Sequence, residues 1–256
     1  MRLLLYVRGP PYREDMPPGL PLPAWLNRVG VFDLETTGVD VSTDRVVTAY
    51  VGVLDERGRQ VAARSWLADP GMPIPAGATA VHGISTEQAR REGRAAHEVV
   101  AEVTAALRSL FDQGVPVVAY NASYDFSLLA SEAARHGLEP LTDPSPVIDP
   151  LVIDKAYDRF RRGRRTLEVV ATHYAVPLES AHEASADAIA AGRVAQALAR
   201  QYDLPETPAE LHTHQIGWAR SQAASLTEYF VSIGRLDPDA SLDGTWPVRS
   251  TEAPVG

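Results

Sequence analysis

The sequence predicts an α/β fold with a mixed five-stranded sheet whose first three strands are antiparallel and which is flanked by helices. Two observations support this prediction. Three runs rich in β-branched and apolar residues, at 28–35, 46–55 and 60–68, are joined by turns. From residue 95 onward, strand-like runs alternate with longer segments of helical periodicity. Consecutive strands followed by such alternation are typical of a mixed sheet covered by helices.

The first half of the chain carries two further signals of local structure. Asp55-Glu56-Arg57-Gly58 is a turn sequence, so the second and third strands should form a hairpin. A loop over 70–75 precedes Ser85 and Gln88, which have the spacing of a capping box and predict a short helix. A longer helix is expected over 95–111, where apolar residues recur on one face.

The second half alternates between strands and helices. The run 115–120 is apolar almost throughout, which indicates a strand buried on both faces. The remaining elements expected up to residue 201 are a helix at 123–136, a strand at 146–149, and helices at 151–160, 166–174 and 184–201. The last of these is rich in alanine, and such small side chains allow close packing against a sheet.

We predict three parts of the chain: an irregular proline-rich arm at 1–27, a catalytic domain at 28–204 and a helical appendage at 205–256. Trp25 and Leu26 are expected to dock the arm onto the domain. In the appendage, a capping box at Thr207 and Glu210 with a proline between them predicts a helix to about residue 233. Its aromatic residues, Trp218, Tyr229 and Phe230, are expected to pack rather than to stack on a ligand.

Composition narrows the classes of function. The chain has 256 residues, no cysteine and a formal charge of −9, so any metal must be held by oxygen or imidazole ligands. The charge argues against binding nucleic acid over the whole surface, although an enzyme can neutralise phosphate locally with metal ions. No apolar run is long enough for a signal-peptide core or a membrane span, so we expect a soluble, cytoplasmic protein.

The most informative stretch is Asp33-Leu34-Glu35-Thr36-Thr37-Gly38, at the end of the first strand. Alternate residues of a strand share a face, so Asp33 and Glu35 place two carboxylates about 7 Å apart. Like charges this close repel each other unless a cation lies between them, and hard divalent cations prefer carboxylate oxygens. Gly38 is expected to take unusual backbone angles that leave main-chain N–H groups free for a ligand.

Two other segments supply residues for the same chemistry. Asp125 follows the apolar fourth strand, and Asp187 lies in the alanine-rich helix, five residues after His182. Five residues on one helix correspond to about 140° of rotation, so His182 must precede the helix for the two side chains to converge. Four carboxylates can hold two divalent ions, and an imidazole can deprotonate a water near neutral pH.

Three motifs in this order resemble those of the DEDDh exonucleases: Asp33-x-Glu35-Thr36-Thr37-Gly38, Tyr120-Asn121-Ala122-Ser123-Tyr124-Asp125 and His182-x-x-x-x-Asp187. The family includes the proofreading epsilon subunits of bacterial DNA polymerase III and their stand-alone homologues. The resemblance covers about residues 28–200. A variant of the superfamily has tyrosine four residues before the last aspartate; this chain has Glu183 there, so the histidine variant matches better.

The resemblance implies an RNase H-like exonuclease fold and metal-dependent 3′→5′ hydrolysis of nucleic acid to nucleoside monophosphates. Two Mg²⁺ or Mn²⁺ ions would be needed. By this resemblance Asp33, Glu35 and Asp187 hold the first ion, and Asp33 bridges to the second, which Asp125 reaches through water. His182 is implied as the general base.

Further residues are expected to contact the substrate. The resemblance implies that main-chain N–H groups around Thr36 and Thr37 meet the terminal nucleotide and that Asn121 meets the substrate near the scissile end. Val81-His82-Gly83-Ile84 resembles a loop on the nucleotide side, so His82 either faces the nucleotide or packs the turn. The basic run 159–165, which includes Arg164 and Arg165, is expected to contact phosphates.

Three hypotheses about function remain open at this point. The leading one is a 3′→5′ exonuclease that acts on single-stranded DNA ends in proofreading or repair, with a DNA polymerase as a candidate partner. The second is an RNA-trimming exonuclease of the RNase T or oligoribonuclease type. The third is a non-catalytic polymerase accessory module that uses the fold and the appendage for docking. A turnover assay with Mg²⁺ on matched DNA and RNA oligonucleotides distinguishes them.

Overall fold

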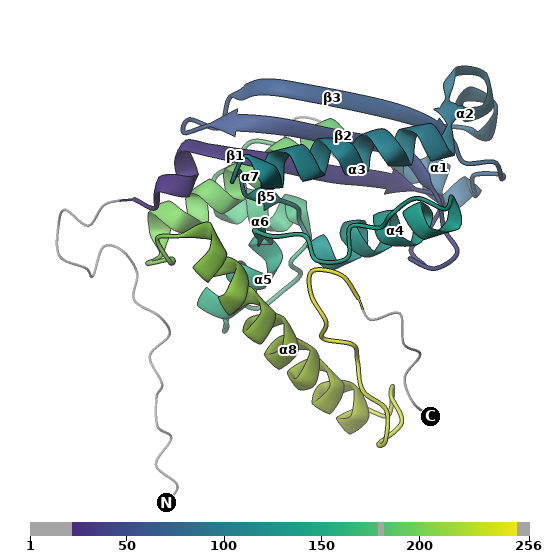
Figure 1. Ribbon diagram of the computed structural model, residues 1–256. Helices are drawn as coiled ribbons and strands as arrows, with labels where there is room; N and C mark the ends of the chain where they lie inside the picture. The colour runs from purple at the N-terminus through teal and green to yellow at the C-terminus, as the bar shows by residue number, and fades with distance from the viewer. Residues whose placement is uncertain (1–21, 179–181, 250–256) are drawn as a thin grey trace, which may run out of the picture.

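The computed structural model describes residues 22–178 and 182–249, and it is built around a six-stranded sheet with the order β4-β3-β2-β1-β5-β6 (Figure 1). The antiparallel meander of the first three strands is confirmed, whereas β5 is parallel to β1 and β6 is parallel to β5. The mixed α/β fold is therefore confirmed. The strands are β1 (Arg28–Thr36), β2 (Val46–Asp55), β3 (Gln60–Asp69), β4 (Arg94–Ala95), β5 (Val117–Val118) and β6 (Val147–Ile148).

The sheet has one strand more than predicted, and one helix was not predicted. β4 pairs parallel with the end of β3, with Ala68 opposite Arg94. It consists of two exposed residues without a β-branched side chain, so the sequence contains no strand pattern there. The unpredicted helix α1 (Ala76–His82) has no buried residue and therefore lacks apolar periodicity. β5 and β6 are shorter than the predicted strands.

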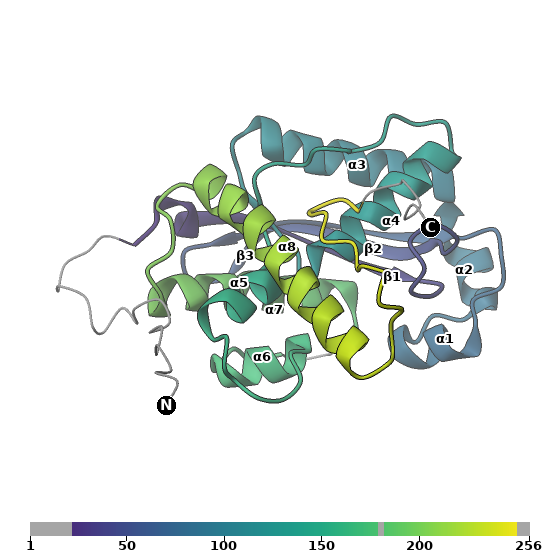
Figure 2. The ribbon, with the colours of Figure 1, turned by 90° about the horizontal axis from the view of Figure 1, so that it is seen from below.

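Helices cover both faces of the sheet (Figures 1 and 2). Two of them pack on the face that carries Phe32 and Leu34 of β1; they are α3 (Ala96–Asp112) and α4 (Ala122–Arg135). Three helices pack on the opposite face, against Val29 and Val31; they are α5 (Pro150–Tyr157), α6 (Leu167–His173) and α7 (Ala184–Gln201). The alternation of β1 therefore sends Asp33 and Glu35 to the α7 face.

The predicted close packing of the alanine-rich helix is confirmed at Gly192. A Cβ atom at this position would lie 2.5 Å from Cγ1 of Val31 and 2.6 Å from Cδ1 of Leu54. Any larger side chain would therefore push α7 away from β1 and β2. This close approach brings the first turn of α7, and with it Asp187, next to the end of β1.

The short helix α2 (Thr86–Glu92) and the long helix α8 (Pro208–Ser232) both begin at the predicted caps. The Ser85 hydroxyl accepts a hydrogen bond from the N–H of Gln88 at 3.1 Å, and the Thr207 hydroxyl accepts one from the N–H of Glu210 at 3.2 Å. Among the described residues, no helix is long and apolar enough to cross a membrane.

The first half of α8 covers the open edge of the sheet. Nδ1 of His212 accepts a hydrogen bond from the N–H of Val147 at 3.0 Å. The amide of Gln215 accepts from the N–H of Asp149 at 2.6 Å and donates to the carbonyl of Val147 at 3.0 Å. These side chains satisfy backbone groups that an edge strand would otherwise leave unpaired. The start of the segment predicted as an appendage is thus bonded directly to β6.

The second half of α8 projects from the body, and the chain then returns beside it (Figures 1 and 2). Trp246 packs against His212 with their ring centroids 4.9 Å apart. The N–H of Arg249 donates to Oγ of Ser127 at 2.7 Å, so the end of the described chain lies against α4. At the other end, Trp25 and Leu26 are buried as expected. The rest of the predicted arm, residues 1–21, lies outside the described residues, as do residues 250–256.

Candidate active site

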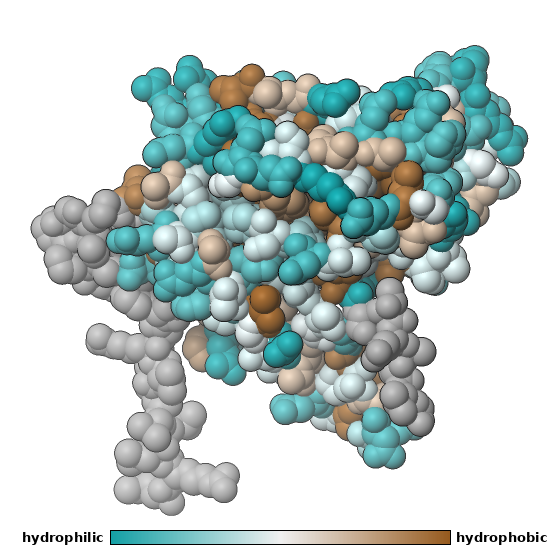
Figure 3. Space-filling model, viewed as in Figure 1, coloured by the Kyte–Doolittle hydropathy of each residue, from teal (hydrophilic) through white to brown (hydrophobic). Residues whose placement is uncertain are grey.

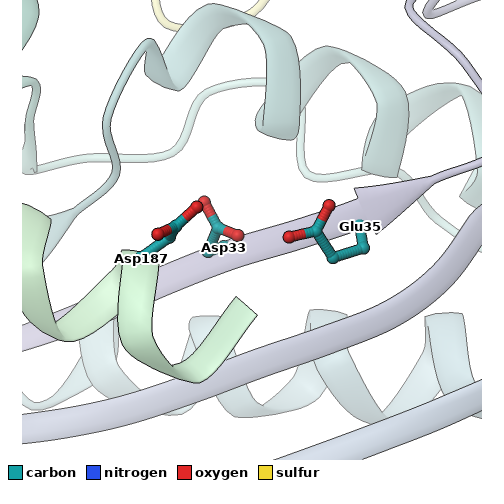
Figure 4. A group of neighbouring side chains, drawn as sticks. All are labelled: Asp33, Glu35 and Asp187. Atoms are coloured by element: carbon teal, nitrogen blue, oxygen red, sulfur yellow. The ribbon is translucent and has the colours of Figure 1, made fainter. Parts of the chain in front are cut away.

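Three of the four predicted carboxylate residues meet at the end of β1 (Figure 4). Asp33 and Glu35 extend from β1, and Asp187 extends from the first turn of α7. One carboxylate oxygen from each lies within 4.8 Å of the others. Oδ1 of Asp187 is buried and has no hydrogen-bond partner among the described residues. A buried acceptor without a donor is costly, so this oxygen fits a ligand that the carboxylates share.

Asp125 stands beside this group rather than within it. It is buried in the first turn of α4, and its Oδ1 accepts a hydrogen bond from the N–H of Leu34 at 3.1 Å. Burial holds the pKa of Asp125 well above its ordinary value. Asp125 is also the nearby charge that most strongly raises the pKa of Asp33. The fourth carboxylate therefore belongs electrostatically to the site.

The carboxylates are arranged so that they destabilise one another's ionised forms. Burial, followed by the charges of Asp125, Glu35 and Asp187, raises the pKa of Asp33 well above its ordinary value. Burial and then the charge of Asp187 raise the pKa of Glu35 to about 7. Burial also raises the pKa of Asp187. Such a cluster requires bound protons or a cation, and its all-oxygen donor set fits a hard divalent cation.

His182 lies before α7, as predicted from its spacing to Asp187. Its backbone is in the left-handed region, with φ of 69°, and its N–H donates to Oδ2 of Asp187 at 3.2 Å. The imidazole is half-exposed, and its Nε2 lies 3.4 Å from Oε1 of Glu168 in the first turn of α6. The main chain of His182 is thus fixed to the carboxylate cluster, while its ring faces a carboxylate that the sequence analysis did not identify.

A cavity of about 410 Å³ opens beside the carboxylates, and Glu35, Tyr50, His82 and His182 are among its lining residues. Nδ1 of His82 accepts a hydrogen bond from the N–H of Ile84 at 3.1 Å, which orients the ring. Burial lowers the pKa of His82. His82 therefore both stabilises its turn and faces the cavity, so the two interpretations made from the sequence are compatible.

The loop after β1 differs from expectation in two respects. The N–H of Thr37, expected to be free for a nucleotide, donates to the carbonyl of Arg45 at 3.0 Å. Gly38 does not have a positive φ. Glycine is needed there because a Cβ atom would lie 2.5 Å from Oδ2 of Asp44. The Asp44 carboxylate also accepts a hydrogen bond from the Thr37 hydroxyl at 2.8 Å, so it holds the loop in place.

Tyr124 connects this loop to α4. Its hydroxyl lies 2.5 Å from both the Thr36 hydroxyl and the Gly38 carbonyl. Neighbouring Phe126 is part of the core, whereas Tyr124 is only half-buried. Tyr124 belongs to the second motif, whereas Asp44 and Glu168 act on the site without belonging to any of the three motifs. Asp44 and Glu168 had no sequence signal that could have identified them.

Asn121 stands where β5 leads into α4, with φ of 60°. Its N–H and that of Ala122 donate to the buried carboxylate of Asp149, at 3.0 and 2.9 Å. Asp149 also accepts a hydrogen bond from the N–H of Leu151 at 2.9 Å, which caps α5. This arrangement fixes the backbone at Asn121. Its side chain is exposed near the carboxyl ends of β5 and β1, where Asp33 also lies.

The basic run divides into two groups in the structure. Arg161 and Arg165 form ion pairs with the buried carboxylate of Asp154 and are largely shielded from solvent. The prediction that Arg165 contacts a substrate phosphate is therefore not supported, because the charge of Arg165 balances a buried acid. Arg159, Arg162 and Arg164 are exposed, so they are the members of the run that face solvent.

Comparison with known proteins identifies the family. The model of the Exonuclease family (RNase_T) matches residues 31–195. The PolC-type DNA polymerase III of Lacticaseibacillus paracasei is 29% identical over 191 residues, which are 74% of this chain and 12% of that protein. A DNA polymerase III subunit epsilon-like protein of Rhodobacter capsulatus is 31% identical over 165 residues, covering 62% of this chain and 22% of that protein. The chain thus spans less than a quarter of the length of either relative.

Solved structures support the same fold. Exonuclease I matches with a TM-score of 0.59 and 17% identity, over 79% of this chain and 45% of that chain. The E. coli exonuclease I complex with a dT13 oligonucleotide matches with a TM-score of 0.55 and 19% identity, over 66% of this chain and 40% of that chain. The family match, together with the ordered motifs that end in His182 and Asp187, shows that the chain belongs to the exonuclease family, as a DEDDh-type member with an RNase H-like fold.

Proposed function

We propose that this protein is a metal-dependent 3′→5′ exonuclease that removes nucleoside monophosphates from single-stranded DNA ends in proofreading or repair. The observation that carries the proposal is the convergence of Asp33, Glu35 and Asp187 beside an open cavity, with Asp125 and His182 adjacent. The choice of DNA rests on the relatives, which are DNA polymerase III proteins, and on a structural neighbour solved with dT13. Association with a DNA polymerase is a further expectation from these relatives.

The carboxylates are the residues that would hold the metal ions. Asp33, Glu35 and Asp187 would hold one Mg²⁺ or Mn²⁺, and Asp33 with Asp125 would hold a second. When bound, two such ions supply stabilisation of the attacking and leaving oxygens of a phosphoryl displacement. The raised pKa values of these acids support this role, because a divalent charge would offset their mutual repulsion.

The remaining residues would position the substrate and move a proton. The imidazole of His182 would take the proton of the attacking water, and Glu168 would stabilise the imidazolium that results. The cavity next to His82 would receive the terminal nucleotide, and the side chain of Asn121 would meet the substrate near the scissile bond. Arg164 would contact a backbone phosphate from its exposed loop.

Metal binding should stabilise the protein more at pH 8 than at pH 5.5. Glu35 has a folded pKa of about 7 against an ordinary 4.5, so without metal its stability contribution is complete below about pH 4.5. That contribution to stability is lost as the pH rises through 7. The carboxylates are then ionised, so binding a cation lowers their mutual repulsion the most. We expect the Mg²⁺-induced rise in unfolding temperature to grow over this range. Scanning calorimetry in Mg²⁺ and in EDTA measures it, with Glu35→Gln as the control that should weaken the trend. A rise that does not depend on pH would contradict the assignment.

Turnover on matched oligonucleotides tests the function itself. With Mg²⁺, the protein should shorten a 5′-labelled single-stranded DNA from its 3′ end in single-nucleotide steps, and faster than the RNA of the same sequence. Denaturing gels of the time course measure both rates, and EDTA should stop the reaction. Faster cleavage of RNA would favour the RNA-trimming alternative. No cleavage of either strand in Mg²⁺ or Mn²⁺ would favour a non-catalytic accessory module.

A further inference from the structure

A groove of about 530 Å³ runs between α5, the loop after it and the projecting part of α8. Lys155, Arg159 and Arg165 line it together with Trp218 and Tyr229, and no carboxylate residue is among its lining residues. Because Arg165 balances buried Asp154, Lys155 and Arg159 are the cations that this lining offers to an anion, which is notable in a chain with a formal charge of −9. Although Arg165 is paired with Asp154, Arg159 is exposed.

The aromatic and apolar side chains of this surface are exposed, contrary to the expectation for Tyr229. Tyr229 is 56% exposed and Leu226 is 43% exposed, whereas Trp218 packs edge-on against Tyr157 with ring centroids 5.5 Å apart. Hydrophobic patches interrupt the hydrophilic surface on the projecting part of the molecule (Figure 3). The guanidinium of Arg159, a lining residue, lies 5.9 Å from the ring centroid of the adjacent Phe160, which is 77% exposed. Cations interleaved with exposed aromatic rings are the features that bind single-stranded nucleic acid without reading its sequence.

The groove continues toward the candidate active site at the carboxyl end of β1. Lys155 also lines a second cavity of about 410 Å³, together with Asn121, Ser123 and Arg249. Asn121 follows β5, which is paired directly with β1, and neighbouring strands lie about 4.8 Å apart. Arg249 is close enough to Tyr124 for its charge to oppose the rise in that hydroxyl's pKa. The same hydroxyl bonds the loop after β1, so this second cavity adjoins the candidate active site.

Lys155 lines both cavities and is available to contact an anion where they meet. It is the only lysine of the chain and is half-buried, and no ion pair joins it to any residue within 22–178 and 182–249. Two carboxylate residues line the second cavity, but both are engaged. Asp149 accepts hydrogen bonds from backbone N–H groups, and Asp243 accepts them from the N–H and hydroxyl of Thr245.

We propose that the α5–α8 groove holds the part of the nucleic-acid strand that lies 5′ of the cleaved nucleotide. Lys155 and Arg159 contact its phosphates, and the Tyr229 ring stacks on a base. This inference rests on the proposed exonuclease function and gives the helical appendage a role as a substrate-holding arm. A protein partner is the competing occupant of the same groove. The charge of the lining and the continuity of the groove with the candidate active site favour the nucleic-acid strand.

The test compares the double variant Arg159→Ser/Tyr229→Ser with the control Arg57→Ser, all in an Asp187→Asn background that leaves substrate intact. Arg57 is exposed in the turn that follows Asp55, and Asp55 pairs with Arg28 at the start of β1, so Arg57 lies at the opposite end of β1 from Glu35. Fluorescence anisotropy with Mg²⁺ gives the Kd of labelled dT3 and dT12. In the background protein, dT12 should bind at least about 10-fold more tightly than dT3, because it fills the groove.

The double variant should reduce this length advantage on the order of tenfold and lower the salt slope of dT12 binding by about 0.7, since one phosphate contact is lost. The control should keep both values. In the active protein, the double variant should raise KM for dT12 with little change in kcat. Both altered side chains are exposed, and an unfolding scan checks the fold. If the double variant fails to fold, the single variant Tyr229→Ser takes its place.

Failure of this inference is distinguishable from failure of the proposed function. If the active protein hydrolyses dT12 but the double variant keeps the length advantage and the salt slope, the groove is not the path of the strand. A protein partner would then be its occupant. If the active protein binds dT12 through the groove without hydrolysing it, the proposed function fails and the groove assignment stands.

Discussion

Asp33→Asn and Asp187→Asn are each expected to reduce hydrolysis by about 10³-fold or more, since metal ions in such sites contribute several kcal/mol to catalysis. Each change removes one negative ligand from the group of carboxylates whose oxygens lie within 4.8 Å of one another. The amide keeps the size of the side chain, so packing should be unchanged. Single-turnover rates on a labelled DNA oligonucleotide in saturating Mg²⁺ measure the loss.

The same Asp33→Asn variant should be more stable than the native chain when both are in EDTA at pH 8. The pKa of Asp33 is raised by burial and by three neighbouring acids, so its ionised form opposes folding without a cation. Lost activity combined with raised metal-free stability separates a ligand role from damage to the fold. Asp112→Asn, an exposed acid at the end of α3, is the control that should change neither quantity. Full activity of the native chain in excess EDTA would contradict the metal assignment.

His182→Ala should lower the single-turnover rate by about 10²–10⁴, the usual contribution of a general base. Metal binding and substrate binding should remain, because His182 reaches the cluster through its main-chain N–H, which alanine retains. Since the ring is proposed to accept the proton of the attacking water, the pH profile of the rate should differ between the native chain and the variant. Paired pH profiles of the two proteins, with Mg²⁺ affinity measured alongside, provide the comparison.

Glu168→Gln is the matched control for the histidine. Its carboxylate lies 3.4 Å from Nε2 of His182, but both side chains are about half-exposed, so the pair is expected to change the rate much less than removal of the ring. Equal pH profiles for the native chain and His182→Ala would exclude His182 from catalysis. A His182→Ala variant that no longer binds Mg²⁺ would instead make the residue structural or a metal ligand.

The sequence was sufficient to predict the elements whose signal is local. The meander of β1, β2 and β3 follows from runs rich in β-branched and apolar residues that are joined by turns. The starts of α2 and α8 follow from capping residues whose bonds lie within one turn. The position of His182 before α7 follows from helix geometry alone. By contrast, β4 and α1 bury too little to leave a pattern in the sequence.

Only the tertiary structure decided which side chains are available for chemistry. Asp125 is bonded to the main chain of β1, Arg165 is paired with buried Asp154, and the N–H of Thr37 is bonded to Arg45, although all three belong to stretches that the sequence marked as functional. Likewise, Tyr229 lies exposed in a groove because α8 bonds to β6 through its first half and projects beyond the body. The order of the motifs was sufficient to identify the family, because that order is a property of the sequence itself. Hydrogen-bond and ion-pair partners come from residues far apart in sequence, and they are chosen only when the chain folds.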